Sequence, residues 1–332
     1  MTPIFSLVAV WTFEGQWNMS LGNVSGKIIH QFVIGGFDTL DRPLTVGIVI
    51  LCIYLLVMLS NLANICFILH DKRLHKPMYL LICNLAVVDM LYSSSACPTM
   101  IGVLVAGDKA IAYVSCFIQM FVFHLGGVME MFAISVMAFD RLIAISNPLR
   151  YQSILTNVRT LVLTGALWLV ACAFVAVMPA TVLSLPYCHS TLKYTFCDYA
   201  ALVRATCVNP SYYFNMITII TFFLLFGTFC SICLSYIWII FAMVKMSSKN
   251  DKRKMYSTCF SHLIVVVCYY VPLFVRIVLT RLGVVLTLEE RHGLMIGAIL
   301  GPSLVNPFVY CFRTKEIKNK MLKMFNKVAP TE

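Results

Sequence analysis

Residues 44–70 read LTVGIVILCIYLLVMLSNLANICFILH, an apolar run that contains no Asp, Glu, Lys or Arg. About 20 apolar residues suffice for a helix to cross the hydrocarbon core of a bilayer. Six further apolar runs of similar length follow along the chain, at residues 78–101, 116–141, 159–181, 211–245, 256–281 and 292–312. The sequence therefore predicts an all-α membrane protein whose main domain, residues 44–312, is a bundle of seven transmembrane helices.

The composition of the 332-residue chain agrees with a membrane environment. The chain is 60% hydrophobic and only 12% charged, whereas a soluble domain is about 25% charged. A transmembrane β-barrel would show segments of about ten residues that alternate in polarity. The apolar runs here are continuous and longer, so the sequence favours helices, which satisfy their backbone hydrogen bonds internally.

The distribution of Lys and Arg predicts how the bundle is oriented. If residues 1–43 lie outside the cell, the inner segments carry 17 of these residues and the outer segments carry 8. Because basic residues gather in cytoplasmic loops, we expect a plasma-membrane protein with an extracellular tail at 1–43 and a cytoplasmic tail at 313–332. The net charge of +11 then faces anionic membrane lipid, and a nucleic-acid partner is excluded.

The predicted extracellular tail carries two glycosylation sequons. Asn18 and Asn23 each open an Asn-x-Ser triplet, so both are expected sites of sugar attachment. The first residues show neither a basic segment nor a small-residue cleavage site, and we expect no cleaved signal peptide.

Four cysteines lie on the predicted outer side. Cys116 opens the third apolar run, and Cys188, Cys197 and Cys207 lie between the fourth and the fifth. An oxidising compartment favours two disulfides, for which three pairings exist. The alternative is free or metal-binding thiols, but no His and Cys spacing here matches a zinc site.

Asp89 and Glu130 are the two carboxylates predicted to lie deep in the membrane. At 1.5 Å of rise per residue, they lie about 15 and 16 Å from the inner ends of their helices and are therefore level. Buried ionisable groups of this kind are usually functional. We expect a sodium ion between them, with Asn61 and Asn306 at similar depth; the alternative is that one carboxyl is protonated.

The inner ends of the third and seventh runs carry a second polar group. Asp140 can hold Arg141 from the side, as a releasable latch would require; the alternative is an interfacial arginine that anchors the helix. At the end of the seventh run, Asn306 and Pro307 precede Tyr310. Pro307 removes a helix hydrogen bond and permits a kink there.

These features together resemble the olfactory receptors, a branch of the rhodopsin-like G-protein-coupled receptors. The resemblance covers roughly residues 44–325, and its segments are 74–79 (LHKPMY), 137–151 (MAFDRLIAISNPLRY), 254–262 (KMYSTCFSH) and 302–310 (PSLVNPFVY), together with Glu130. Some positions depart from the commonest mammalian pattern and suggest a fish-type branch tuned to water-soluble odorants. They are Ser60, Phe139, Leu142, Ser146 and residues 269–272 (YYVP).

The resemblance carries further expectations about pairing and partners. It implies disulfides between Cys116 and Cys197 and between Cys188 and Cys207. It also implies that the inner face binds a heterotrimeric G protein with a stimulatory olfactory α subunit. The residues expected to serve coupling and activation are Asp140, Arg141, Lys254, Ser257, His262, Asn306, Pro307 and Tyr310.

The tail after the seventh run is expected to add one more element. Residues 313–320 are basic and look like the short amphipathic helix that lies along the inner leaflet in this family. A disordered basic tail is the alternative.

The ligand is expected in the outer half of the bundle. His124 lies about 12 Å below Cys116, and the small residues near it leave room. The residues predicted to contact the ligand are Phe123, His124, Gly127, Val128, Tyr270, Leu273, Ile277 and Arg281. His124 and Arg281 can together bind a carboxylate, although such a His often bridges helices and such an Arg often anchors at the interface. A monoamine is disfavoured because Phe123 replaces an acidic residue.

The sequence disfavours two other classes of membrane protein. A transporter commonly shows internal repeats, and a retinal pump would need a buried lysine in residues 292–312, which contain none. A membrane enzyme would need a nucleophile and base or a metal-binding spacing, and the sequence shows neither. A receptor without a cofactor, other than sodium, is therefore the prediction.

Overall fold

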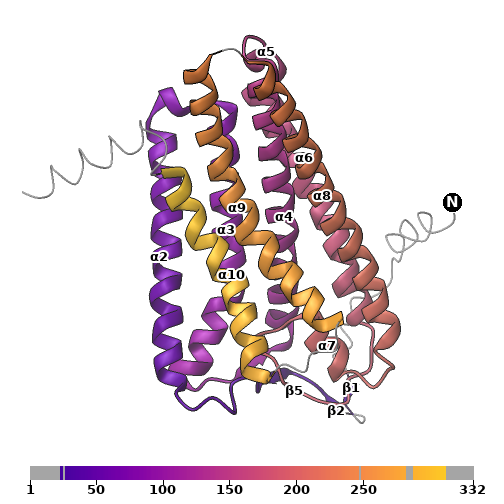
Figure 1. The fold of residues 1–332 in the computed structure, drawn as a ribbon. Coiled ribbons are helices and arrows are strands. Elements are labelled where there is room, and N and C mark those ends of the chain that lie inside the picture. Colours follow the sequence, from indigo (N-terminus) through magenta and orange to yellow (C-terminus); the bar gives the residue numbers. More distant parts are fainter. Residues whose placement is uncertain (1–22, 25–26, 247, 282–286, 312–332) are drawn as a thin grey trace, which may run out of the picture.

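The computed structural model describes residues 23–24, 27–246, 248–281 and 287–311, and it confirms the predicted helical bundle (Figure 1). Seven helices of this part of the chain are long and apolar enough to cross a membrane. They are α2 (Pro43–His70), α3 (Pro77–Ile101, continued by the π-helical turn η3, Gly102–Ala106), α4 (Tyr113–Ser146), α6 (Asn157–Val182), α8 (Ser211–Lys245), α9 (Lys249–Arg281) and α10 (Leu288–Cys311).

Local sequence signals set several of the helix starts. Pro43 and Pro77 occupy first positions of α2 and α3, where the missing N–H costs no hydrogen bond. The Thr156 side chain accepts a hydrogen bond from the backbone N–H of Arg159 at the start of α6. Such caps satisfy donors that the helix itself leaves free.

The helices differ in how much of their surface is covered. Most residues in the central spans of α3 and α4 are buried, whereas few residues in those of α2, α6 and α8 are. Large apolar side chains such as Leu169, Phe223 and Trp238 point outward. A soluble protein rarely exposes such continuous apolar surface, and lipid is the solvent that accepts it.

One end of the bundle, which we call the disulfide end, carries a small sheet that the sequence did not predict. Strand β3 (Gln31–Ile34) pairs antiparallel with β4 (Ala110–Ala112) and parallel with β5 (Thr191–Leu192). Strands β1 (Asn23–Val24) and β2 (Lys27–Ile28) form a separate antiparallel pair. A β-carbon on Gly36 would lie 2.4 Å from the Tyr194 backbone, so only glycine permits this close approach.

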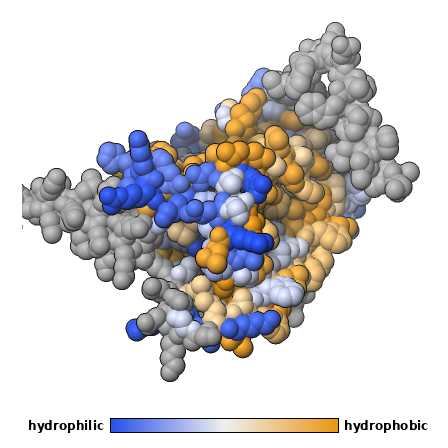
Figure 2. Space-filling view, turned by 90° about the horizontal axis from the view of Figure 1, so that it is seen from above, coloured by the Kyte–Doolittle hydropathy of each residue, from blue (hydrophilic) through white to orange (hydrophobic). Residues whose placement is uncertain are grey.

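The opposite end, which we call the Arg141 end, carries the short segments η2 (Lys72–Leu74) and α5 (Tyr151–Ile154). Figure 2 looks onto this end and shows hydrophilic residues gathered on the end face, with hydrophobic residues along the flank. Polar ends and an apolar flank are the surface that a membrane-spanning bundle requires.

Candidate functional site

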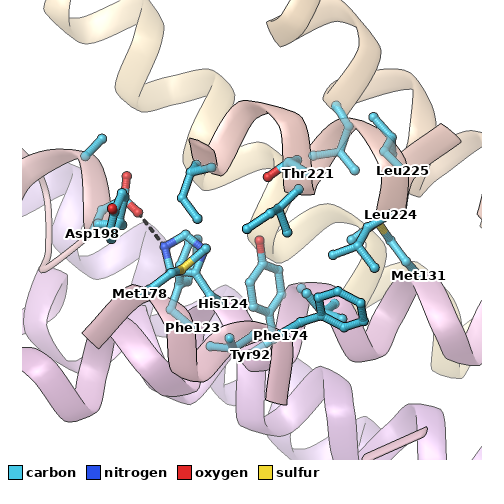
Figure 3. Close-up of a pocket in the computed structure, with 18 of the residues that line it drawn as sticks. Tyr92, Phe123, His124, Met131, Phe174, Met178, Asp198, Thr221, Leu224 and Leu225 are labelled. Carbon is cyan, nitrogen blue, oxygen red and sulfur yellow. Dashed lines mark hydrogen bonds and ion pairs between the residues drawn. The ribbon is translucent and has the colours of Figure 1, made fainter. Parts of the chain in front are cut away.

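The structure contains a cavity of about 240 Å³ in the half of the bundle nearer the disulfide end. Most of its lining is apolar, as expected for a pocket that binds a small organic molecule. The lining comes from α3, α4, α6, α8, α9 and α10, with the loop before α7 (Tyr199–Ala205) and the start of that helix as its cover. Figure 3 shows apolar side chains such as Met131, Leu224 and Leu225 around it.

A hydrogen bond joins an imidazole and a carboxylate of this lining. The Nε2 atom of His124 is 2.9 Å from Oδ1 of Asp198, and both side chains are largely buried (Figure 3). Asp198 directly precedes α7 and follows Cys197. Its carboxylate therefore reaches the cavity from the loop, whereas His124 reaches it from α4.

Two interactions fix the loop position that carries Asp198. The disulfide between Cys116 and Cys197 joins the loop to α4, with 5.3 Å between the two Cα atoms. The backbone N–H of Cys197 donates to Oε1 of Gln119 at 2.9 Å, and the Gln119 amide donates in turn to the carbonyl of Ser95. Cys197 is thus bound directly to α4 and, through Gln119, to α3, and this fixes the backbone next to Asp198.

Glycines shape the wall that α4 presents to the cavity. A β-carbon on Gly126 would lie 2.8 Å from Cβ of Tyr92, so α3 and α4 touch there. A β-carbon on Gly127 would only reach ordinary contact, 3.8 Å from Tyr92. The Gly127 carbonyl accepts a hydrogen bond from the Tyr269 hydroxyl at 2.7 Å. Gly127 therefore leaves free space, whereas Gly126 permits packing.

Most of the predicted ligand-binding residues that the structure describes do line the cavity. These are Phe123, His124, Gly127, Val128 and Leu273.

Tyr270 lies elsewhere. Its buried hydroxyl donates to Oγ1 of Thr228 at 2.8 Å, and its neighbour Tyr269 lines the cavity instead. Tyr269 is one helical turn from Leu273, which places the two on one face; the sequence pattern assigned that face to Tyr270. The side chains of Ile277 and Arg281 lie outside the described residues.

Asp198 is the acidic residue of this lining, and it is among the lining residues that the sequence did not predict. It lies in the loop between α6 and α8, where helical spacing cannot predict how deep in the bundle a residue lies. The one signal that could have found it is its position next to Cys197, because that disulfide fixes the loop over the bundle.

Both disulfides implied by the resemblance are present. Cys116 pairs with Cys197, and Cys188 pairs with Cys207. Nine other cysteines in the described part of the chain are free. The alternative of metal-binding thiols at this end is therefore wrong.

The polar group in the middle of the bundle brings Asp89 and Glu130 together. Both carboxyl groups are fully buried and near enough for their charges to influence each other, and the Asn306 amide donates to both oxygens of Asp89 at 3.0 Å. The Asn61 amide donates to the Ser303 carbonyl. Four buried oxygen atoms of Ser93, Glu130 and Asn306 lack a hydrogen-bond partner among the described residues.

Asp140 and Arg141 are both buried at the Arg141 end. Asp140 accepts a hydrogen bond of 2.5 Å from the Tyr151 hydroxyl, and Arg141 lies 3.8 Å from Asp140 and 2.8 Å from Sδ of Met78. Burial and the Asp140 carboxylate raise the pKa of Tyr151, which keeps this phenol a hydrogen-bond donor.

His262 and Tyr310 lie close to this pair and are also buried. The Nε2–H of His262 donates to the Ile134 carbonyl at 3.0 Å, and Nδ1 lies 2.9 Å from the Tyr236 hydroxyl. Tyr310 lies 3.8 Å from Sδ of Met137. His262 therefore joins α9 to α4 and α8.

The structure describes the side chains of only some of the remaining predicted coupling and glycosylation residues. Pro307 lies inside α10, and Ser257 is exposed on α9. The Lys254 side chain, Asn18, the Asn23 side chain and the expected helix at 313–320 lie outside the described residues.

Comparison with known proteins places the chain in a family. The family model described as olfactory receptor matches residues 50–328. The chain is 34% identical to human olfactory receptor 10G4 over 85% of this chain and 90% of that protein, and 34% identical to the dog olfactory receptor-like protein OLF3 over 93% and 97%. Mouse olfactory receptor 1M1 is 31% identical over 85% and 90%. The chain therefore belongs to the olfactory receptor family and is a multi-pass, odorant-binding G-protein-coupled receptor of the plasma membrane rather than an enzyme.

Proposed function

We propose that this receptor binds an odorant with an apolar body and one neutral polar group in the cavity next to His124 and Asp198. The apolar lining suits a hydrocarbon body, and the hydrogen-bonded side chains of His124 and Asp198 offer polar atoms at the cover. Binding then activates a stimulatory olfactory G protein at the Arg141 end. The pairing of His124 with Asp198 is the observation that carries this proposal.

We place the disulfide end outside the cell. Disulfides form and persist in oxidising compartments, and both bridges lie at this end. The excess of Lys and Arg in the segments at the Arg141 end points the same way. This orientation puts the N-terminal tail with Asn18 and Asn23 outside and residues 313–332 inside.

A carboxylate odorant is the second candidate. His124 is the only basic side chain among the described residues of the lining, and an anion would have to compete with Asp198 for it. Because like charges repel strongly where water is scarce, the carboxylate of Asp198 favours a neutral group. The preference for water-soluble odorants, which the resemblance to a fish-type branch suggests, stays a prediction.

Replacing Asp198 with Asn separates these two candidates. For a neutral odorant, Asp198→Asn removes a charge-assisted hydrogen bond and is expected to raise the EC50 about tenfold or more. For a carboxylate odorant it removes a competitor, and the EC50 is expected to fall. The measurement is a cAMP reporter assay over alcohols, aldehydes, ketones and carboxylic acids.

Asp108→Asn is the matched control, because Asp108 is exposed at the same end and does not line the cavity. If Asp198→Asn reaches the cell surface at the wild-type level and leaves the EC50 of every active compound unchanged, the odorant does not bind next to His124 and Asp198.

Signal transfer requires an odorant that binds one of two bundle conformations more tightly than the other. The cavity contacts α9 through Tyr269 and Leu273, and α9 also carries His262 near Arg141. A shift of α9 would break the His262 contacts to Ile134 and Tyr236 and open the Arg141 end. We propose that the G protein occupies the space so formed.

We also propose that Asp89 and Glu130 hold a sodium ion. Hard cations take oxygen ligands. Buried oxygen atoms of Glu130, Ser93 and Asn306 lack hydrogen-bond partners among the described residues, so this cluster fits a hard cation. Bound sodium would supply the positive charge that two buried carboxylates lack. The alternative is a shared proton.

Sodium is expected to stabilise the odorant-free receptor. At ten times its dissociation constant, a bound ion adds about 1.4 kcal/mol to the free energy of unfolding, which a thermal melt in NaCl against choline chloride detects. Asp89→Asn should remove the difference between the two salts. If wild-type receptor melts at one temperature in both salts, the site holds a proton instead.

A further inference from the structure

A second cavity, of about 640 Å³, opens at the disulfide end, and we call it the vestibule. It is lined by residues 188–194, three residues of α7 and Arg291 at the start of α10. Helix α7 separates it from the odorant cavity. Tyr199 and Ala200 line the odorant cavity, whereas Ala201 and Arg204 line the vestibule.

The lining of the vestibule is basic. Lys193, Arg204 and Arg291 carry fixed positive charges, His189 adds a fourth basic group, and no carboxylate belongs to the lining. None of these four side chains forms an ion pair within 4 Å among the described residues. A concave surface of one charge sign concentrates ions of the other sign.

The carboxylate nearest to Arg291 in the sequence, that of Glu290, forms a hydrogen bond at the start of α10. Glu290 precedes Arg291, but its Oε2 accepts the backbone N–H of Thr287 at 2.9 Å, while the Thr287 hydroxyl accepts the N–H of Glu290. This reciprocal pair is a capping box at the start of α10. Glu290 is therefore directed to the helix terminus, and within the described part of the chain no carboxylate forms an ion pair with Arg291.

Both arginines are held by aromatic rings. The guanidinium carbon of Arg204 lies 5.4 Å from the ring centroid of Phe214, and that of Arg291 lies 5.4 Å from the centroid of Tyr194. A ring that covers the face of a guanidinium leaves the N–H groups at its edge free to donate. Those N–H groups form the fork that binds carboxylate or phosphate oxygens in pairs.

The wall that carries Arg204 is rigid. The disulfide between Cys188 and Cys207 closes it, and the backbone N–H groups of Cys188 and His189 both donate to the Ala205 carbonyl, at 2.9 and 3.2 Å. These contacts fix the backbone on both sides of this wall, and the side chains of His189 and Arg204 are exposed there, so their positive charges face solution.

We propose that the vestibule is a binding site for a small dianion, held by Arg204 on α7 and Arg291 on α10. The ligand class is a compound with two carboxylates or one phosphate group. The site is distinct from the odorant cavity and does not depend on which odorant fits there.

The test uses purified full-length receptor in neutral lipid nanodiscs, titrated with succinate and, separately, with inorganic phosphate at constant ionic strength. We expect a saturable rise in melting temperature with at least one of them, and the stronger one identifies the source of the anion. Arg204→Gln and Arg291→Gln should each weaken binding about tenfold or more. Arg204→Lys keeps the charge but loses the fork, and it should fall between wild type and Arg204→Gln.

Two controls make the result specific. Lys109→Gln removes one positive charge at the same end, from a side chain that pairs with Asp38 outside the vestibule, and should bind like wild type. Gly127→Trp, which fills the odorant cavity, should also leave anion binding unchanged. The proposal is overturned if neither anion saturates, if both Arg→Gln variants bind like wild type, or if Lys109→Gln weakens binding equally.

Discussion

Cys116→Ser is expected to abolish the response to every odorant. The bridge to Cys197 closes a separation of 81 residues, for which loop-closure entropy gives a stabilisation of roughly 4–5 kcal/mol. That is a large part of the stability of an ordinary domain. The bridge also holds Asp198 beside His124, so its loss removes the cover of the odorant cavity together with the stability.

The measurement combines surface staining of intact cells with the cAMP reporter. Cys66→Ser is the control, because Cys66 is a free, exposed cysteine on α2 and its replacement should leave both readouts unchanged. The bridge between Cys188 and Cys207 spans only 19 residues and is worth about 3 kcal/mol on the same estimate. A Cys116→Ser receptor with normal staining and normal EC50 values would contradict the role given to this disulfide.

Gly127→Trp is expected to remove the odorant response while the receptor still reaches the cell surface. The first carbon of a side chain at Gly127 meets only ordinary contacts with Tyr92, so the rest of the indole extends into the cavity of about 240 Å³. An odorant cannot then occupy the same volume. We expect the EC50 to rise at least a hundredfold for every active compound, because overlap of atoms cannot be relieved in a close-packed interior.

Gly165→Trp is the matched control. Gly165 lies exposed on α6 with no atom within 4 Å of a β-carbon there, so the same indole would point into lipid. Its surface level and EC50 should match those of wild type. An unchanged response of Gly127→Trp would place the odorant outside this cavity.

The sequence predicts the bundle well because one physical constraint dominates it. Backbone groups in lipid must pair within a helix, so each long apolar run has one solution. The helix bounds agree with the predicted spans to within five residues except at the start of α9. That helix begins at Lys249, because the polar residues before residue 256 continue it beyond the apolar run. Hydrophobicity alone gives no signal there.

The site was predictable only where helical periodicity sets the geometry. His124 and Gly127 fall on the inward face of α4 and line the cavity as expected. Tyr270 was assigned to the wrong face, since two adjacent tyrosines offer the same chemistry about 100° apart. Asp198 and the strands β3, β4 and β5 belong to loops, where contacts between distant segments decide position.

The vestibule, too, could not be predicted from helical periodicity. Arg204 and Arg291 are 87 positions apart in a sequence whose spacing relates neither to the other. Only the disulfide between Cys188 and Cys207 and the arrangement of α7 and α10 bring both arginines to one cavity. Charge patterning alone gives no sign that the two arginines share a cavity.

The most direct test of this account is a cryo-electron microscopy map of the receptor with an active odorant and its G protein. We predict odorant density beneath Asp198, in contact with His124 and Leu273, and the G protein at the Arg141 end. Odorant density at any other place, with this cavity filled by its own side chains, would contradict the account.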